Sequence, residues 1–183
     1  TVEAYVKYNA FNDWSRFFDF GDADNTDTFG SANKFNTGSA RFWVRLASTS
    51  SELYVDSDST TFFEVDVWAH IVYTIDDTTM IMYKDGDEDS KNPSGQEPRE
   101  LERELHYIGQ SVLGTNRLYG TIAYLRFWHG QALDASQVAE LYAARIEPTL
   151  APTGEPTMEP TVTGAPTGEP TPVPTEPFSS CLA

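Results

Sequence analysis

Hydrophobic and polar residues alternate along much of the first part of the chain, with the period of two that is typical of β-strands. Val2, Ala4 and Val6 form one such apolar series, and segment 42–46 (FWVRL) forms another, in which Arg and Trp take the alternate positions. Segment 70–75 (HIVYTI) is instead apolar on both faces, which predicts an inner strand. The pattern therefore predicts an all-β fold.

Turn signals separate these strand patterns. Residues 76–79 (DDTT) predict a hairpin loop, and Asp85-Gly86 predicts a tight turn. The strongly charged stretch 87–104 contains two prolines and predicts an exposed loop, in which residues 99–104 can form a short helical turn. Strand patterns resume at 105–109 and at 118–128.

One helix is predicted, after the last strand. Asp134 is suited to the N-cap, and Gln137, three residues later, can return a hydrogen bond to it. Val138, Leu141 and Tyr142 then form an apolar stripe at helical spacing. We expect this face of the helix to pack on the strands.

Residues 147–177 differ in composition from the rest of the chain: they are rich in Pro, Thr and Glu and contain no Lys, Arg or aromatic residue. The hexapeptide PTGEPT occurs twice, from Pro152 and from Pro166. Proline removes backbone donors, and the scarcity of large apolar residues leaves little to offset the entropy cost of ordering. We therefore divide the chain into a folded domain, 1–146, and a disordered Pro/Thr/Glu-rich stalk, 147–183.

Charge and cysteine content narrow the function classes. The net charge is −16, and because five acidic residues belong to the stalk, −11 remains on residues 1–146. Such a surface repels nucleic acid and anionic lipid, and no apolar run approaches the ~20 residues needed to cross a bilayer.

Cys181 is the one cysteine, so an intrachain disulfide is excluded, which suits a cytosolic protein. A Thr/Pro-rich stalk that can carry O-linked sugars instead favours a secreted or cell-surface protein. We give the stalk more weight and expect a secreted or cell-surface protein.

The order of the strand motifs is informative. In chain order they are TVEAYVKY, SRFFDFGD, WAHIVYTID, MIMYKDG, HYIGQS and YGTIAYLRFWHGQALDASQVAELY. This series resembles the laminin-G-like jellyroll domains of the concanavalin A-like lectin/glucanase superfamily, over about residues 1–144. The resemblance implies a two-sheet antiparallel sandwich that serves as an extracellular binding module for carbohydrate or protein, often with calcium.

Members of this family carry one or two strands before the equivalent of TVEAYVKY. The chain begins in that motif and without Met, so a signal peptide or further domains can precede it. Either the chain is a fragment that lacks its first strands, or its sheet has an unprotected edge at the N-terminus.

Acidic residues are concentrated in segment 19–27 (DFGDADNTD). Ca²⁺ takes six to eight oxygen ligands, which Asp19, Asp22, Asp24 and Asn25 can help to supply. The resemblance supports calcium as a cofactor, because family members often bind it at the rim of the sandwich. The alternative is that the loop only forms Asx turns.

Three other features are interpreted as structural. The acidic cluster 85–89 lacks the Gly and Glu of an EF-hand loop and predicts a solvated hairpin tip. Glucanases of the superfamily use Glu-x-Asp and a second Glu on one strand, but after 64–66 (EVD) the second Glu is replaced by Trp68 and Ala69. The three histidines lie in or beside strand patterns, and no serine lies in a Gly-x-Ser-x-Gly elbow. We therefore expect no enzymatic activity.

Sugar binding would require exposed aromatic rings beside polar groups. The candidates are Trp14, Trp43, Tyr54, Asn116, Arg117 and Tyr119. For each aromatic residue the alternative is a place in the core. The sequence thus predicts a non-catalytic extracellular module that binds carbohydrate or protein and is displayed on a stalk; the alternative is an architectural spacer or accessory domain of a larger adhesin, cell-wall protein or enzyme.

Overall fold

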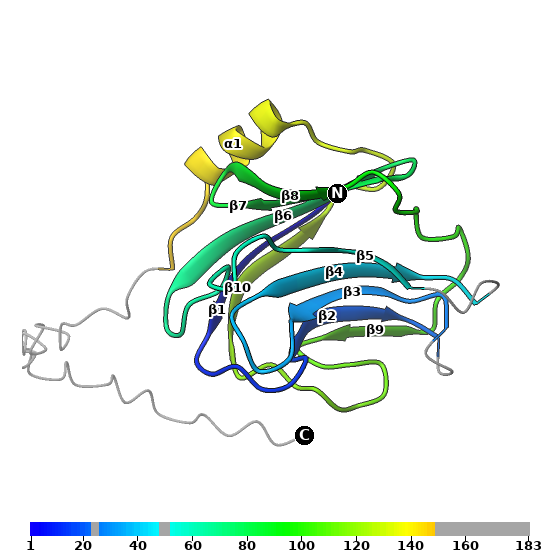
Figure 1. Cartoon of the computed structure of the whole chain (residues 1–183), viewed down its shortest axis with the longest axis horizontal. Coiled ribbons are helices and arrows are strands. Elements are labelled where there is room, and N and C mark those ends of the chain that lie inside the picture. The colour runs from blue at the N-terminus through cyan, green and yellow to red at the C-terminus, as the bar shows by residue number, and fades with distance from the viewer. Residues whose placement is uncertain (23–25, 48–51, 149–183) are drawn as a thin grey trace, which may run out of the picture. The chain divides into compact units, whose positions relative to one another are not determined.

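Two antiparallel β-sheets stack face to face in the computed structural model, which describes residues 1–22, 26–47 and 52–148 (Figure 1). Sheet A contains, in spatial order, β10 (Gly120–Phe127), β1 (Val2–Tyr8), β6 (Trp68–Asp76), β7 (Thr79–Lys84) and β8 (Asp87–Asn92). Sheet B contains β5 (Glu52–Asp56), β4 (Ala40–Arg45), β3 (Phe29–Asn33), β2 (Arg16–Gly21) and β9 (Leu105–Ile108). The predicted two-sheet sandwich is confirmed.

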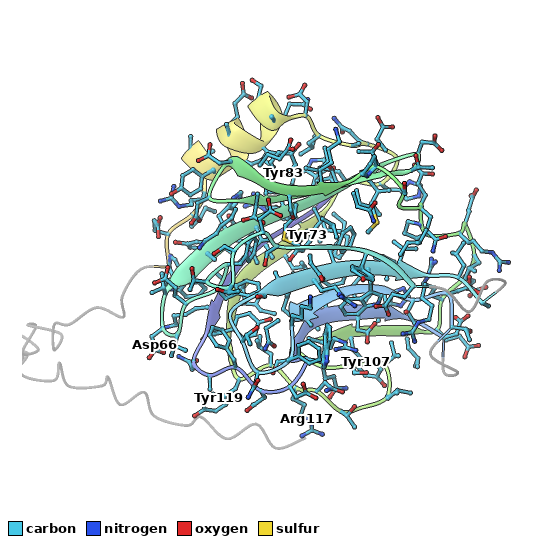
Figure 2. The ribbon with its side chains drawn as sticks, in the orientation of Figure 1. Asp66, Tyr73, Tyr83, Tyr107, Arg117 and Tyr119 are labelled. Carbon is cyan, nitrogen blue, oxygen red and sulfur yellow. The ribbon has the colours of Figure 1, made fainter. Side chains whose placement is uncertain are left out.

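The space between the sheets is filled by the apolar members of the alternating series. Val2 and Val6 of β1 and Phe42 of β4 are buried there, as the sequence pattern predicts. Tyr73 of β6 lies between the sheets (Figure 2), where its ring stacks on Phe42 with centroids 4.6 Å apart. Its hydroxyl is hydrogen-bonded to that of Ser31 at 2.8 Å, and burial raises the pKa of this phenol.

The inner strand and its turns also follow the sequence. Strand β6 lies between β1 and β7, and the chain reverses at Asp77 and again at Asp85-Gly86, where the φ angles are positive.

The charged stretch that follows, residues 87–104, differs from the prediction. Residues 87–92 form the edge strand β8 instead of a loop or a solvated tip, because their backbone satisfies the free side of β7. The short helical turn expected at 99–104 is not formed.

Helix α1 (Ala135–Ala143) begins where the sequence predicts and lies on the outer side of sheet A (Figure 1). The Asp134 carboxylate accepts a hydrogen bond from the amide of Gln137 at 2.9 Å, and the amide of Asp134 donates to the Gln137 side chain at 3.0 Å. Val138 is buried against Val72 and Tyr83. No helix within the described ranges is long and apolar enough to span a bilayer.

The N-terminal strand is not at a sheet edge. Strand β1 pairs with β6 on one side and with β10 on the other, so the unprotected edge considered for the N-terminus does not fall on β1. The outermost strands are β10 and β8 in sheet A and β5 and β9 in sheet B. Phe127 is 45 % exposed on the edge strand β10.

Of the predicted stalk, only Glu147 and Pro148 belong to the described residues. The Glu147 carboxylate accepts a hydrogen bond from the Tyr5 hydroxyl at 2.7 Å and lies 2.6 Å from the Arg145 guanidinium. These contacts connect the start of the predicted stalk to the outer side of sheet A. The prediction for the remainder, 149–183, lies outside the described residues.

Candidate functional site

The face of sheet B that points away from the core gathers charged and aromatic side chains. On β4 the apolar residues enter the core, so the alternate residues Arg41, Trp43 and Arg45 point the other way. The strand register places Arg41 opposite Asp56, Trp43 opposite Tyr54 and Arg45 opposite Glu52 of β5. Together with Trp14 and Arg16, these six residues are called the arginine–aromatic face.

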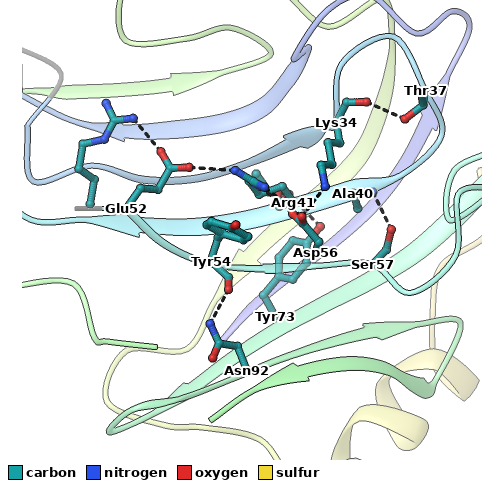
Figure 3. A network of polar contacts seen from close by, with 12 residues as sticks. Lys34, Thr37, Ala40, Arg41, Glu52, Tyr54, Asp56, Ser57, Tyr73 and Asn92 are labelled. Atoms are coloured by element: carbon teal, nitrogen blue, oxygen red, sulfur yellow. Dashed lines mark hydrogen bonds and ion pairs between the residues drawn. The ribbon is translucent and has the colours of Figure 1, made fainter. Parts of the chain in front are cut away.

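Ion pairs hold the side chains of this face in place (Figure 3). Arg41 donates to both carboxylate oxygens of Asp56, at 2.6 and 2.9 Å, and the Lys34 ammonium donates to the same carboxylate at 2.6 Å. Glu52 accepts from Arg45 at 2.7 Å and from Arg41 at 3.4 Å. Burial opposes the ionisation of Asp56, but the hydrogen bonds from Arg41 and Lys34 outweigh it and lower the pKa of this carboxyl.

Guanidinium groups lie over the aromatic rings of the face. The Arg41 guanidinium is 3.5 Å from the ring centroid of Tyr54 and 5.1 Å from that of Trp14. The Arg16 guanidinium lies 4.6 Å from the ring centroid of Trp43. An arginine that stacks on a ring can still donate hydrogen bonds in its own plane, so stacking orders these groups without using up their donors.

A hollow of about 230 Å³ opens on this face. It is lined by Trp14, Arg16, Arg41, Trp43, Arg45 and Glu52. Gly30 of β3 lies beneath the Trp43 ring, where a Cβ atom would come within 2.5 Å of it. Glycine at this position therefore lets the indole lie close to the strand.

Contacts with two loops position Trp14 and Arg16, the lining residues of the hollow that do not belong to β4 or β5. The Trp14 amide donates to the Phe35 carbonyl at 3.0 Å, and the two rings meet edge to face. The Asn116 side chain donates to the Asp13 carbonyl at 2.8 Å, and the Asn116 carbonyl accepts from the amide of Arg16 at 2.9 Å. Asn116 thus supports the segment that carries Trp14 and Arg16.

The other residues predicted to contact a sugar divide into two groups. Trp14 and Trp43 line the hollow, and Tyr54, 40 % exposed, lies beside Trp43 on the neighbouring strand. Trp43 is only 4 % exposed, so the alternative of a packed ring holds for this residue. Arg117 and Tyr119 lie in the connection that leads into β10 and do not line the hollow (Figure 2). The structure therefore brings the three aromatic residues of β4, β5 and the first loop together and leaves Tyr119 apart.

The arginines of the face are not singled out by the sequence analysis. The alternation in β4 already places Arg41 and Arg45 on the same side as Trp43, so the sequence contains a signal for these two. Arg16 comes from β2, two strands away from β4, and precedes an irregularity in the pairing of β2 with β3. Its place beside Trp43 depends on sheet order, which the local pattern does not contain.

The predicted calcium ligands are only partly described. The Asp19 carboxylate accepts hydrogen bonds from the Arg16 guanidinium at 3.4 Å and from the Val112 amide at 3.2 Å, while its Oδ1 is buried with no partner among the described residues. Burial raises the pKa of Asp19, although Arg16 and the Val112 amide oppose the shift. Within ranges 1–22, 26–47 and 52–148, Asp19 and Asp22 do not belong to any group of three acidic, His or Cys side chains suited to a metal.

The two remaining predicted ligands, Asp24 and Asn25, lie outside the described residues. The unpartnered oxygen of Asp19 is compatible with a cation, whereas the neighbouring guanidinium already supplies positive charge there. The calcium site therefore stays a prediction.

Asp66 and His70, which were considered for catalysis, have structural contacts. Glu64 and Asp66 lie in the turn that precedes β6, and Asp66 accepts a hydrogen bond from Asn9. These two carboxylates therefore do not share a strand face, as the glucanase arrangement requires. His70 is fully buried in β6, with its Nε2 atom 2.9 Å from the Glu3 carboxylate.

A larger hollow, of about 600 Å³, opens elsewhere on the sandwich. Its walls include inward-facing core side chains such as Phe42 and Tyr73. Two cations of its lining are engaged with the protein: Arg99 lies 3.4 Å from the Asp27 carboxylate, and Arg103 donates to the Asp27 carbonyl at 2.8 Å. Because guanidinium groups and an accessible indole ring converge on the smaller hollow, we place the candidate site on the arginine–aromatic face.

Solved structures with a similar fold include modules from three proteins. The CBM40 of the Ruminococcus gnavus IT-sialidase is 12 % identical, with a TM-score of 0.63 over 77 % of this chain and 80 % of that one. Domain 4 of AbnA, an extracellular GH43 arabinanase from Geobacillus stearothermophilus, is 21 % identical (TM-score 0.55; 77 % and 65 % covered). Domains LG4-5 of the mouse laminin α1 chain are 14 % identical (TM-score 0.53; 74 % and 36 % covered). At these identities the similarity shows the fold alone.

Sequence comparison identifies the family. No curated protein matches the chain. The family model described as the concanavalin A-like lectin/glucanases superfamily matches residues 1–139, which is most of the chain. With the observed two-sheet sandwich, this match shows that the protein belongs to the concanavalin A-like lectin/glucanases superfamily.

Proposed function

We propose that the folded domain is a non-catalytic carbohydrate-recognition module that binds its ligand through the arginine–aromatic face. The observation that carries this proposal is the hollow of about 230 Å³, around which two indole rings and three guanidinium groups meet. An indole ring offers a flat apolar surface to the C–H groups of a sugar ring. Guanidinium N–H groups can donate hydrogen bonds to the sugar oxygens at the same time.

The rigidity of the face favours binding. Asp56 and Glu52 hold Arg41 and Arg45 in ion pairs before any ligand arrives, so few side-chain rotamers have to be ordered on binding. The hollow is also small and concave, which suits a small ligand such as a sugar ring, whereas a stable protein–protein interface spreads over roughly 800 Å² of each partner. We therefore favour a saccharide over a protein as the ligand.

Two of the similar structures are complexes with saccharides. The R. gnavus CBM40 is seen with α2,3-sialyllactose, and domain 4 of AbnA is seen with arabinotriose. These ligands belong to those proteins; their relevance here is that this sandwich can present a saccharide site. AbnA is extracellular, and we extend that location to this chain. The Pro/Thr-rich stalk then acts as a spacer, and calcium bound at segment 19–27 stabilises the folded domain.

A glycan array probed with the whole chain tests the proposal. We expect binding to a defined group of glycans, and a loss of about tenfold or more for Trp14→Ala, because the change removes one aromatic wall and 1.4 kcal/mol corresponds to tenfold. Tyr119→Ala is the matched control, since this ring is 60 % exposed but does not line the hollow. Thermal melting of both variants separates loss of binding from loss of folding.

Two outcomes would contradict the proposal. If the folded chain binds no glycan on an array that covers neutral and acidic saccharides, the architectural spacer becomes the supported function. If Tyr119→Ala abolishes binding while Trp14→Ala leaves it unchanged, the site lies on the connection to β10 and not on the arginine–aromatic face.

A further inference from the structure

Positive charge is concentrated on the arginine–aromatic face. The chain has only 12 Lys and Arg residues against 28 Asp and Glu residues. Four of the cations, Arg16, Lys34, Arg41 and Arg45, form ion pairs on this side of sheet B with three carboxylates, those of Asp19, Glu52 and Asp56. This set therefore carries one more positive than negative charge, within a chain whose net charge is −16.

The excess positive charge of this set is best assigned to Arg16. Its Nε atom is 3.4 Å from the Asp19 carboxylate, which is longer than the roughly 2.7–2.9 Å of a strong charge-assisted hydrogen bond. Its Nη1 atom donates to the Trp14 carbonyl at 2.8 Å, and no described residue accepts a hydrogen bond from Nη2. Arg41, in contrast, uses all three of its nitrogens on carboxylate oxygens.

Burial makes the charge of Arg16 costly. The Arg16 side chain is 20 % exposed and lines the hollow. Burial lowers the pKa of its guanidinium; Asp19 and then Glu52 oppose this shift, and the positive charge of Arg45 adds to it. A further anion beside Arg16 would offset the lost hydration.

We propose that the arginine–aromatic face takes a saccharide that bears a carboxylate, with the carboxylate at Arg16 and the sugar ring against Trp14. This inference rests on the proposed carbohydrate-binding function and specifies its ligand class. The planar fork of an arginine matches the two oxygens of a carboxylate, and the Trp14 ring beside it supplies the apolar contact that a free anion could not use. A neutral saccharide could accept hydrogen bonds from Arg16 but would not compensate its positive charge.

The test compares matched saccharides on the wild-type chain by isothermal titration calorimetry. The probes are tetragalacturonate and 3′-sialyllactose, each paired with its carboxyl-reduced form, which keeps the ring and loses the charge. We expect at least one acidic probe to bind tenfold or more tightly than its reduced partner, and added salt to weaken the binding of the acid only.

Substitutions then test whether the carboxylate of the saccharide binds at Arg16. Arg16→Gln should remove the preference for the acid over the reduced form while binding of the reduced form persists. Lys91→Gln, which removes one exposed positive charge from β8 in the other sheet, should leave the preference unchanged. If Arg16→Gln does not fold, Arg45→Gln is measured instead, and there the preference should fall but not vanish.

The outcomes distinguish this inference from the proposed function. Equal binding of acidic and reduced probes overturns the inference and leaves carbohydrate recognition standing. Absence of binding to every probe and every glycan on the array overturns both. A preference for the acid that survives in Arg16→Gln overturns the assignment of the carboxylate to Arg16.

Discussion

At the scale of single residues, the arginine–aromatic face depends on Gly30. A Cβ atom there would lie 2.5 Å from the Trp43 ring and 2.8 Å from the Phe18 carbonyl oxygen. We expect Gly30→Ala to lower the free energy of unfolding by about 1–3 kcal/mol, measured by urea denaturation, because the ring and the strand must shift. In a Trp43→Leu background the ring clash is removed, so the same change should cost less; an equal cost in both backgrounds would contradict the role given to Trp43.

Sequence reasoning predicts the aromatic half of the candidate site better than the charged half. Trp14, Trp43 and Tyr54 are informative as residue types because a large aromatic ring either packs against neighbours or offers a flat apolar surface, and Trp43, 4 % exposed, does the former. Arg41 and Arg45 look like ordinary solvated residues in the sequence. Their significance comes from the carboxylates and rings beside them, which belong to other segments of the chain.

At the scale of elements, the helix illustrates how far local signals reach. The side chain of Asp134 caps the first turn of α1, and Val138 anchors the helix on sheet A. We expect Asp134→Ala to lower the free energy of unfolding by about 1 kcal/mol, because an amide of the first turn loses its acceptor. Asp134→Asn keeps a capping oxygen and should cost less in the same urea titration; equal losses for both variants would show that the cap contributes little.

Strand β8 shows where local signals fail. Its sequence, DEDSKN, has low strand propensity and predicts a loop, yet residues Asp87–Asn92 pair with β7, with one irregularity in the register. The backbone of β7 needs hydrogen-bond partners on that side, and an exposed edge tolerates charged side chains that also discourage pairing with other chains. Tertiary context therefore overrides propensity here.

At the scale of the whole molecule, calcium binding would appear as added stability. An extracellular calcium module has a dissociation constant of roughly 0.1–1 mM, so 10 mM Ca²⁺ would stabilise the folded chain by about 1.4–2.7 kcal/mol. For a domain of this size we expect the melting temperature to rise by roughly 3–10 °C in differential scanning fluorimetry. Asp22→Ala should abolish this rise in melting temperature, and 10 mM Mg²⁺ should not reproduce it. An unchanged melting temperature with Ca²⁺ would show that the predicted calcium site is wrong.

The sequence by itself determined the all-β class, the strands that alternate between core and solvent, the capped helix and the boundary of the Pro/Thr-rich tract. All of these depend on spacing or composition within a short segment, which the chain order records directly. Only the tertiary structure decided that Arg16 of β2 lies over Trp43 of β4, and that β1 lies inside its sheet. Such placements depend on which strands pair and in what register, and that is settled by packing between residues far apart in the chain.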